Sequence, residues 1–515
     1  MDPKTAFEIA MDSPVAGTFD DVLMIPQKSV VIPSRVSLET MLSPNIPLHV
    51  PLVSADMDSV TNSRLSIALA KQGGIGFIWN NPDLDFLEGE VKTVKNHTAV
   101  RIDNPAYVFE DQTFRDVNRA LKENNGRFST FIVVDRNMKP VGLINREKTP
   151  LARNDDLVSK FMTKTIFNEE ERNDQGYKWA YDRMRETNAA KLIIVDSSGL
   201  LKALYSANAI RSLVEGTDIF NRDRNGRLRV GVNVGTYDHT DGPDKVRVAR
   251  ELYLTKVERI LKAGADAILI GTAHGHTRNV IEATEEVKSN FTGFEFDLIV
   301  GNVATYEGAR DLFKAGADTV KAGVGPGSIC TTRIVTGFGA PQVWAINETV
   351  KAAEEFDRYI LADGGIKYSG DGAKALAAGA SSVMIGSLFA GTDESPGEVI
   401  DLDGKKFKMY RGMGSEGAMR ANLEARKRYM QDEVDPEKLV AEGVEGRVKY
   451  VGSVEDFVFQ FAGGLRAALG YGGSANIKEY QQKVRFLRIT AAGIRESHPH
   501  DITITSEAKN YSPSK

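Results

Sequence analysis

The sequence predicts an α/β protein built on a (β/α)8 barrel, or TIM barrel, with an α/β module inserted into it. Three observations support this fold: a repeated helix–turn–strand motif, eight buried apolar runs, and a separate duplication between the second and third runs. The chain has 515 residues, which is too long for one ordinary domain. A barrel of about 250 residues or more with an insertion fits this length.

The repeated motif occurs three times, as ILKAGADAILIG (260–271), LFKAGADTVKAG (312–323) and ALAAGASSVMIG (375–386). Each copy contains the end of an amphipathic helix, a glycine that stops it, and a short apolar run typical of a strand buried on both faces. The alanines after the stop glycines, at 265, 317 and 380, are spaced by 52 and 63 residues. This spacing predicts that the three copies belong to every second βα unit of a barrel.

Five further apolar runs complete the set of strands, at 51–54, 75–79, 229–234, 297–301 and 359–362. Each is followed by a polar or glycine-rich loop and then by a helical stretch. A doubly wound sheet produces part of this pattern, but eight parallel strands with this periodicity favour the barrel.

Residues 99–212 are predicted to form the inserted module, between a first barrel segment (1–98) and the remainder of the barrel (213–515). FIVVD (131–135) is echoed by LIIVD (192–196), 61 residues later, and helical stretches at 114–123 and 176–187 precede the two copies. An elaborated loop is the alternative, although so long a loop with an internal duplication is uncommon. The duplication and its placement resemble tandem cystathionine-β-synthase (CBS) modules, which implies purine nucleotides as regulators.

Composition narrows the class of protein. The chain is 42% hydrophobic and 26% charged, with a formal charge of −5, so nothing favours nucleic acid or an anionic membrane as a partner. The first residues lack the features of a signal peptide, and no apolar run is long enough to span a membrane. The single cysteine excludes an internal disulfide and fits a reducing compartment. We therefore expect a cytoplasmic protein.

That cysteine, Cys330, lies in KAGVGPGSICTTR (321–333), directly after a predicted barrel strand. A lone cysteine is usually a small buried apolar residue. Here, however, Gly323, Gly325 and Gly327 precede it at the face where barrel enzymes place their active sites. A glycine-rich loop lets the backbone approach a ligand or turn carbonyls toward a cation. We interpret Cys330 as a nucleophile.

Glycine-rich turns also end the last two predicted strands, at ADGGI (362–366) and IGS (385–387). Glycines after strands are common for turn reasons alone, but loops at these two positions form the usual phosphate site of such barrels. Asp363 could accept hydrogen bonds from sugar hydroxyls. The implied ligand is a phosphorylated sugar or a nucleotide.

Several long segments resemble the family of inosine 5′-monophosphate (IMP) dehydrogenases and guanosine 5′-monophosphate (GMP) reductases. They are GVGPGSICTTRIVTGFGAPQ (323–342), LADGGIKYSGDGAKALAAGASSVMIGSLFAGTDESPGE (361–398), YRGMGSEGAM (410–419) and AAGIRESHPHDITIT (491–505), with TFDDVLMIP (18–26) and MDSVT (57–61). The similarity runs almost from end to end. It is closest to the bacterial type of dehydrogenase.

The resemblance implies NAD-dependent oxidation of IMP to xanthosine 5′-monophosphate (XMP), a step toward guanine nucleotides. Cys330 would attack C2 of the purine, hydride would pass to NAD⁺, and water would hydrolyse the covalent thioimidate. Arg428 and Tyr429 match a pair on a mobile flap that activates this water, assisted by Thr332. Without the resemblance, Arg428 would be a solvated charge in a basic run, and arginine is an unusual general base because its pKa is normally above about 12.

The remaining family positions implied by the resemblance bind substrate, cofactor and metal. Positions matching phosphate and ribose contacts are Asn302, Ser328, Asp363, Gly365, Gly386, Ser387 and Tyr410, and those matching base contacts are Met413, Gly414 and Glu442. Cofactor-binding positions are Gly271, Thr272, Gly323 and Gly325. A potassium ion would be held by carbonyls of Gly325, Gly327 and Cys330, with Glu496, Ser497 and His498 from a neighbouring subunit. This shared site implies a homotetramer, which could assemble further into an octamer.

Two positions depart from the dehydrogenase pattern. Gly271 stands where the family has an aspartate that contacts the dinucleotide, so either another group compensates or the activity differs. Glu416 stands where dehydrogenases have an apolar residue and where GMP reductases have a catalytic glutamate. Arg428, Tyr429 and the potassium segment favour the dehydrogenase. A GMP reductase using NADPH, and a nucleotide-binding paralogue without turnover, remain alternatives.

Overall fold

The structure of the protein is a computed structural model, which describes residues 16–97, 100–103, 105–123, 130–164, 166–170, 176–214, 219–237 and 242–511. The expected first residue of the insertion (99) and the chain start used to judge a signal peptide lie outside these ranges. The chain divides into two compact units, one of residues 1–94 with 229–515 and the other of residues 95–228. Among the described residues, no helix combines the length and apolarity needed to cross a membrane.

Eight parallel strands close into a barrel in the order β13-β14-β15-β16-β17-β18-β4-β5, and β5 pairs with β13 to complete the ring. The strands are β4 (Leu52–Ser54), β5 (Ile75–Ile78), β13 (Gly231–Asn233), β14 (Ala267–Gly271), β15 (Asp297–Val303), β16 (Thr319–Ala322), β17 (Tyr359–Asp363) and β18 (Ser382–Ile385). Each corresponds to one of the eight predicted runs. The prediction of a (β/α)8 barrel is therefore confirmed.

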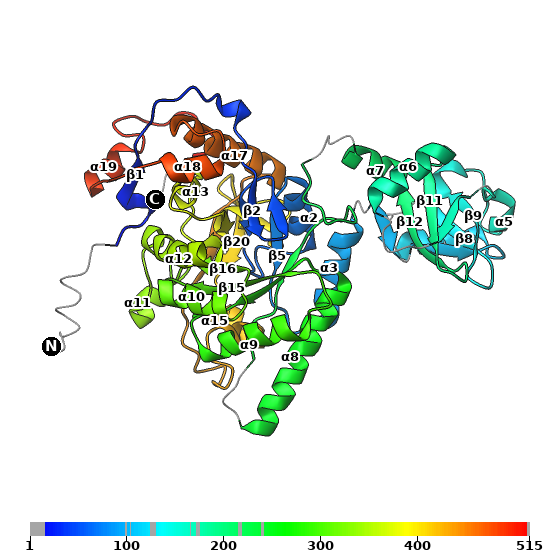
Figure 1. Cartoon of the computed structure of the whole chain (residues 1–515), viewed down its shortest axis with the longest axis horizontal. Helices are drawn as coiled ribbons and strands as arrows, with labels where there is room; N and C mark the ends of the chain where they lie inside the picture. The colour runs from blue at the N-terminus through cyan, green and yellow to red at the C-terminus, as the bar shows by residue number, and fades with distance from the viewer. Residues whose placement is uncertain are drawn as a thin grey trace. The chain divides into compact units, whose positions relative to one another are not determined.

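Helices follow the strands around the barrel (Figure 1). They are α2 (Ser63–Lys71), α3 (Leu84–Asn96), α8 (Pro243–Ala263), α9 (Arg278–Asn290), α10 (Tyr306–Lys314), α12 (Gln342–Phe356), α13 (Ser369–Ala377), α14 (Ser387–Ala390) and α17 (Val454–Tyr471). The three repeated stop glycines, Gly264, Gly316 and Gly379, have φ angles of 101°, 108° and 107°. This left-handed backbone ends α8, α10 and α13 and turns the chain into β14, β16 and β18.

A hairpin of β2 (Thr40–Ser43) and β3 (Ile46–Leu48) covers the amino end of the barrel. The Ser43 hydroxyl donates to Asp297 at the start of β15 (2.5 Å), and Thr319 at the start of β16 donates to the carbonyl of Leu42 (2.6 Å). The hairpin thus occupies this end, and the opposite end, where the strands finish, is left for a site.

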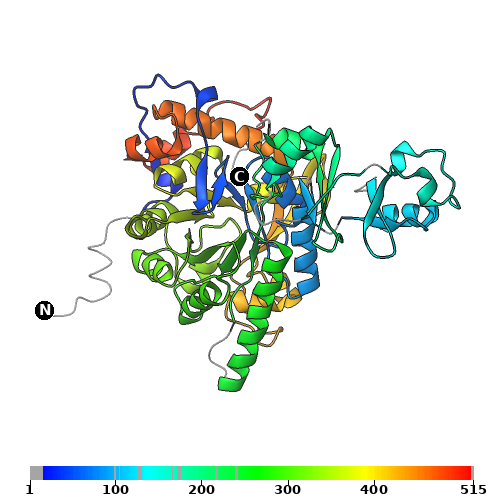
Figure 2. The same ribbon diagram turned by 45° about the vertical axis from the view of Figure 1, so that its right-hand side comes forward.

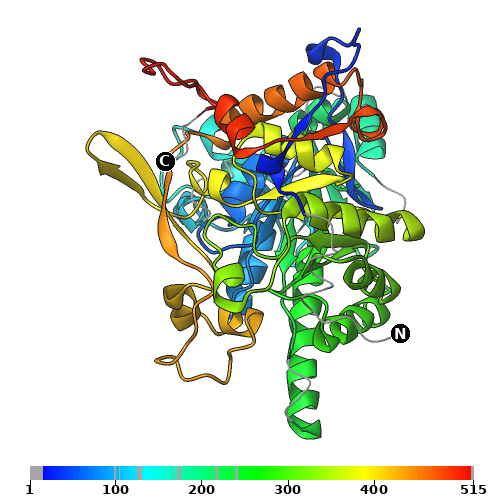
Figure 3. The same ribbon diagram turned by 90° about the vertical axis from the view of Figure 1, so that its left-hand side faces the viewer.

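Further elements surround the barrel. They are η1 (Phe19–Asp21), η2 (Pro33–Arg35), β1 (Val22–Met24), α11 (Thr332–Thr336), β19 (Val399–Leu402), β20 (Lys405–Arg411), α15 (Glu416–Ala421), α16 (Leu423–Arg428), β21 (Glu445–Lys449), α18 (Ile477–Lys483), β22 (Phe486–Arg488) and α19 (Ala491–Glu496). β1 pairs with β22, so the blue N-terminal segment runs beside the orange and red C-terminal helices (Figure 2). The β19–β20 hairpin, in yellow, projects from the body, and β21 pairs with β20 (Figure 3).

The second unit contains two sheets, one of β7 (Tyr107–Phe109), β8 (Thr130–Val134) and β9 (Pro140–Asn145), the other of β10 (Asn168–Glu170), β11 (Lys191–Val195), β12 (Leu201–Ser206) and β6 (Arg101–Asp103). Its helices are α4 (Phe114–Glu123), α5 (Val158–Phe161), α6 (Tyr177–Thr187) and α7 (Ala207–Val214), with η3 (Arg146–Lys148).

Both copies of the duplicated motif in this unit have the same topology. β8 is parallel to β7 and antiparallel to β9, and β11 is parallel to β10 and antiparallel to β12. Asp135 and Asp196 follow the two central strands, and each carboxylate accepts two backbone N–H groups in the next turn. The compact unit extends from 95 to 228, beyond both expected boundaries of 99 and 212.

Candidate active site

An open cleft of about 800 Å³ lies at the carboxyl end of the barrel strands. Its walls come from the ends of β15, β17 and β20, from the loops that follow β4, β14, β16, β17 and β18, and from the segment between β20 and β21. The predicted site residues that line it are Thr272, Asn302, Gly323, Gly325, Gly327, Cys330, Thr332, Asp363, Gly386, Tyr410, Met413, Arg428, Tyr429 and Glu442. The barrel therefore brings most of the predicted residues to one place.

The loop from β16 to α11 presents Cys330 half-buried in this cleft. Its sulfur lies 3.2 Å from the hydroxyl oxygen of Thr332. Cys330 forms a β-bridge with Gly443, and the Thr331 N–H donates to the carbonyl of Glu442 at 3.0 Å. The cysteine loop is thereby fixed against the segment that carries Glu442, so the nucleophile and the predicted base-contacting carboxylate face one cleft.

Arg428 and Tyr429 reach the cleft from the end of α16. Ser415 caps α15 and Asn422 caps α16, since their side chains accept backbone N–H groups of the first turns. The segment has its own apolar cluster of Met413, Met419 and Ala425, against which Tyr429 packs. A Cβ at Gly414 would lie 2.5 Å from the Tyr429 ring, so the predicted base-contact position Gly414 is required here by the approach of Tyr429.

Four charged side chains form a chain at the floor of the cleft, in which Lys321 and Asp56 are buried and Asp363 and Arg428 line the cleft. Lys321, from inside β16, donates to Asp363 at 2.8 Å and to Asp56 at 3.3 Å. Arg428 donates from Nη1 to Asp56 Oδ2 at 2.6 Å. Two carboxylates thus neutralise two cations, as burial requires.

These contacts determine the protonation of the Asp56–Arg428 pair. Burial alone would raise the pKa of Asp56, but Arg428 and Lys321 outweigh it and lower the pKa to about 2. Burial alone would lower the pKa of Arg428, but Asp56 raises it above its ordinary value. Burial raises the pKa of Tyr429 to about 12. Asp56 is therefore a carboxylate, Arg428 a cation and Tyr429 a neutral phenol at neutral pH.

A second hollow of about 670 Å³ adjoins the cleft on the side of β17 and β18. The predicted phosphate-side residues Ser328, Gly365, Gly386, Ser387 and Tyr410 line it. Asn302 donates to Asp363 at 2.8 Å and to the carbonyl of Gly323 at 2.8 Å, while its own buried Oδ1 has no hydrogen-bond partner among the described residues. An orphaned buried acceptor at a cleft wall is suited to a hydroxyl donor on a ligand.

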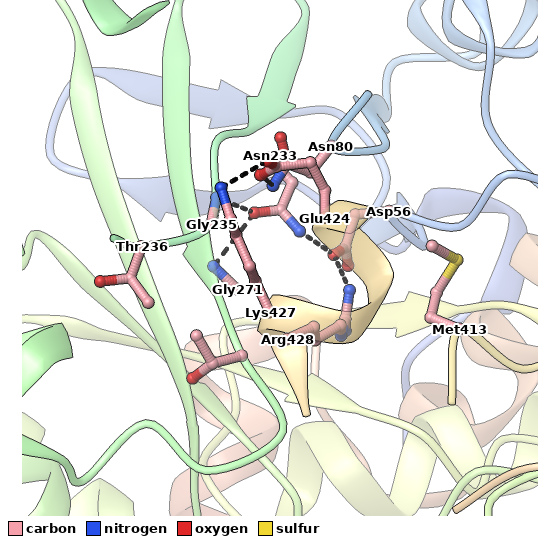
Figure 4. Close-up of a pocket in the computed structure, with 11 residues that line it drawn as sticks. Asp56, Asn80, Asn233, Gly235, Thr236, Gly271, Met413, Glu424, Lys427 and Arg428 are labelled. Carbon is pink, nitrogen blue, oxygen red and sulfur yellow. Dashed lines mark hydrogen bonds and ion pairs between the residues drawn. The ribbon is translucent and has the colours of Figure 1, made fainter. Parts of the chain in front are cut away.

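A smaller pocket on the other side of Arg428 contains Gly271 and Thr272 (Figure 4). The carboxamide of Asn233, at the end of β13, lies over Gly271 and donates to Asp56. Glu424 of α16 accepts hydrogen bonds from Asn80 at 2.7 Å and from Lys256 at 3.1 Å.

Some predicted residues lie away from the cleft. Glu416 is not among the described residues that line the cleft. Its side chain is 60% exposed and pairs with Arg420 at 2.8 Å. Glu496 ends α19 and Ser497 and His498 follow it, and none of the three lines this chain's cleft.

Four residues of this arrangement, Asp56, Lys321, Asn233 and Glu424, are not among the site residues predicted from the sequence. The charged Lys321 within an apolar strand, and Asp56 two residues after the end of β4, were signals that could have indicated two of them.

Comparisons with known proteins agree with this architecture. A model of the IMP dehydrogenase / GMP reductase domain matches residues 16–500. The chain is 46% identical over 500 residues to an inosine-5′-monophosphate dehydrogenase of Aquifex aeolicus, covering 96% of this chain and 97% of that protein. It is 44% identical over 499 residues to the enzyme of the same name from Helicobacter pylori, covering 96% and 98%.

Among solved structures, a cysteine-to-alanine variant of GMP reductase from Trypanosoma brucei in complex with guanosine 5′-monophosphate superposes with a TM-score of 0.85 at 34% identity. The match covers 96% of this chain and 100% of that one. GMP reductase from the same organism in complex with guanosine 5′-triphosphate gives a TM-score of 0.74 at 30% identity, covering 94% and 100%. Since the family model spans nearly the whole chain and the relatives match over their full lengths, the chain belongs to the IMP dehydrogenase / GMP reductase family.

Proposed function

We propose that the protein oxidises IMP to XMP with NAD⁺, the step that commits a purine to guanine nucleotide synthesis. The observation that carries the proposal is the meeting of Cys330 and Thr332 with Arg428 and Tyr429 in one cleft. A nucleophile and a separate cation–phenol pair are what an addition followed by a hydrolysis needs. The curated relatives at 42–46% identity carry the dehydrogenase name.

In the proposed reaction, the Cys330 sulfur adds to C2 of the purine. NAD⁺, when bound, would supply the acceptor for the hydride that leaves C2, and the oxidised base would remain attached to sulfur as a thioimidate. Water then adds to C2, the C2–S bond breaks, and the electron pair returns to sulfur. The sum is IMP, NAD⁺ and water giving XMP, NADH and one proton.

Arg428 and Tyr429 would hold and polarise the hydrolytic water. Because Asp56 raises the pKa of Arg428, the guanidinium of this arrangement acts as a cation that stabilises developing hydroxide. The Thr332 hydroxyl, 3.2 Å from the Cys330 sulfur, would lie beside the carbon to which that sulfur adds. Arg428 and Tyr429 would thus activate the water while Arg428 stays protonated in the ground state.

The nucleotide would lie along the two adjoining hollows. Ser328, Gly365, Gly386, Ser387 and Tyr410 would surround the phosphate, Asn302 and Asp363 would bind the ribose, and Met413, Gly414 and Glu442 would contact the base. The cofactor would use the side of Gly271 and Thr272, together with Gly323 and Gly325. The unpartnered Oδ1 of Asn302 supports a ligand with hydroxyl donors on this wall.

Potassium fits the donor set that the resemblance suggests. Carbonyls of Gly325, Gly327 and Cys330 are hard oxygen donors, and carbonyls of Glu496, Ser497 and His498 of a neighbouring subunit could complete a cage. The ion would order the cysteine loop. We propose a homotetramer on this basis, with an octamer as a further assembly.

The second unit is proposed to be a tandem CBS module that binds purine nucleotides as regulators. It contains a hollow of about 800 Å³ lined by Tyr181, Met184, Arg185, Asn188, Ala189, Ala190, Ala207 and Arg211. Two arginines and an aromatic ring are suited to a nucleotide's phosphates and base. A cytoplasmic location is also proposed, since a nucleophilic Cys330 must stay reduced.

GMP reduction is the second candidate, because the two solved structures described above are GMP reductases. By the family resemblance, Glu416 also stands where such enzymes carry a catalytic glutamate. The exposed ion pair of Glu416 with Arg420 supports the dehydrogenase instead. Mixing the protein with IMP, NAD⁺ and potassium chloride should give steady NADH absorbance and XMP. NADPH oxidation and ammonia release with GMP would indicate the reductase, and activity in neither assay a binding protein.

Cys330→Ala tests the covalent step. Turnover should fall below detection, because Cys330 is the one thiol of the chain, whereas IMP should still bind with a Kd within about tenfold of the unmodified protein. Calorimetric titration measures the second quantity. Persistent NADH formation in this variant would contradict the covalent mechanism.

A further inference from the structure

We infer that Asn233 is a positioning residue for the Asp56–Arg428 ion pair, and that Gly271 is glycine because the Asn233 carboxamide occupies the space above it. The inference rests on the proposed function, in which Arg428 holds the hydrolytic water. It concerns a residue at the end of β13 that the motifs of the sequence did not indicate.

Every polar group of the Asn233 side chain is used (Figure 4). Its Nδ2 donates to Asp56 Oδ2 at 2.6 Å, and its Oδ1 accepts the backbone N–H groups of Gly235 at 2.9 Å and Gly271 at 3.2 Å. The two backbone donors fix which end of the amide faces Asp56. Since Asn233 is buried, this orientation is held by the barrel itself.

Asp56 Oδ2 therefore receives two donors, one from Asn233 and one from Arg428. The first comes from a barrel strand, and the second comes from α16. Because Asn233 is fixed on a strand, its donor holds the Asp56 carboxylate in the rotamer that accepts the hydrogen bond from Arg428. Without it, Oδ2 would keep only Arg428, and the carboxylate could rotate toward Lys321, which already donates to Oδ1.

The room for this arrangement depends on Gly271. A Cβ at this position would lie 2.9 Å from Asn233 Nδ2 and 3.2 Å from Asp56 Oδ2. Any side chain would push the carboxamide away from Asp56, and a carboxylate would add a second negative charge beside it. The neutral amide of Asn233, from the neighbouring strand, thus occupies the space of the side chain that Gly271 lacks. Asn233 is therefore the compensating group expected for a glycine at position 271.

Asn233 should affect one step of the reaction and not the other. Asn233 acts on Arg428 through Asp56, and Arg428 is proposed to act on water. Loss of the Asn233 donor should therefore slow hydrolysis of the thioimidate and leave its formation largely intact. A residue that only supported the barrel would slow both steps together.

Rapid mixing of the full-length protein with IMP and NAD⁺ separates the two steps, because the first turnover of NADH reports thioimidate formation and the steady state reports hydrolysis. We expect Asn233→Ala to keep the first-turnover rate within about twofold and to lower the steady-state rate by about tenfold or more. Asn233→Leu, which keeps the volume but loses the donor, should behave alike. Equal losses in both phases, or no loss in either, would overturn the positioning role.

The spatial match is tested without turnover. Gly271→Ala should lower Tm by several degrees in the unmodified chain, and by clearly less when combined with Asn233→Ala, because the added methyl then has room. Gly293→Ala is the matched control, since nothing lies within 4 Å of its Cβ position. An unchanged Tm cost of Gly271→Ala in both backgrounds would overturn the match. A protein that forms no NADH from IMP would instead refute the proposed function, and the Tm comparison would still decide the match.

Discussion

At the scale of single residues, the site is organised by charge as much as by its nucleophile. Asp56 lies between Lys321 and Arg428, and all three side chains come from different elements. Removing one member of a buried, compensated set leaves the others without a partner, which usually costs more than the pair contributes. Both the stability of the site and the placement of Arg428 consequently depend on Asp56.

Asp56→Asn should lower the free energy of unfolding by about 3 kcal/mol, because two buried cations would share one remaining carboxylate. The pKa of Asp56 falls from 3.8 to about 2 on folding. A depressed folded pKa contributes stability above the unfolded value, and this contribution is lost as pH falls toward the folded value. Denaturant titrations between pH 5 and pH 2 should thus show a loss of about 2 kcal/mol in the unmodified protein that the variant lacks.

Asp85→Asn provides the control for that titration, since the Asp85 side chain is 87% exposed. It should retain the full acid-dependent loss of the unmodified protein. An identical acid slope in Asp56→Asn would show that Asp56 does not carry the depressed pKa.

At the scale of elements, helix α16 is held to the barrel by a polar contact and not only by its apolar face. Glu424 accepts from Asn80, which follows β5, and from Lys256 of α8. Burial alone would raise the pKa of Glu424, but Lys256 and Lys427 outweigh it and lower that pKa. Glu424 is therefore ionised, and its charge ties the helix that ends in Arg428 to two parts of the barrel.

Glu424→Gln should loosen α16, because the amide keeps the volume but leaves Lys256 buried without its counter-charge. Hydrogen–deuterium exchange of residues 423–429 should accelerate by about tenfold, and steady-state hydrolysis should slow with it. Glu437→Gln, on an acid with a 76% exposed side chain in the same segment, is the matched control. Unchanged exchange in Glu424→Gln would show that the apolar cluster alone docks the helix.

At the scale of the whole molecule, the barrel closes without help from the second unit. β5 and β13 flank the insertion in sequence but pair directly, Phe77 with Gly231 and Ile78 with Val232. The second unit has its own buried cores, around residues such as Leu192 and Phe131. Each unit therefore satisfies its apolar residues internally.

Replacing residues 95–228 by a short linker should leave a folded barrel whose kcat for IMP stays within about twofold, because every residue of the cleft lies in the first unit. Any effect of added purine nucleotides on the full-length chain should disappear. Steady-state assays with and without guanosine triphosphate measure both. Loss of kcat in a folded, truncated protein would show that the barrel depends on the second unit.

The sequence predicted the eight barrel strands because each is an apolar run that is buried on both faces, and the barrel needs little more than their order. It predicted Cys330 and the phosphate loops because these follow strand ends. It did not predict the Asn233–Asp56–Arg428 contact, since those residues come from β13, the loop after β4 and α16 and meet only once the barrel is closed. The exposure of Glu416 likewise depends on the rotation of α15, which local sequence does not determine.

The ends of the second unit are joined by a buried ion pair. The Lys95 ammonium lies 2.9 Å from Asp223, which also accepts from Arg227, and both partners of the first pair are largely shielded from water. Once folded, this unit brings its two ends together, so the chain between β5 and β13 behaves as a short link and not as a long random loop. Most of the conformational entropy lost on closing this loop is therefore lost when the second unit folds, before β13 pairs with β5. Because residues 95–228 leave the ribosome before most of the barrel strands, synthesis itself favours this order of assembly.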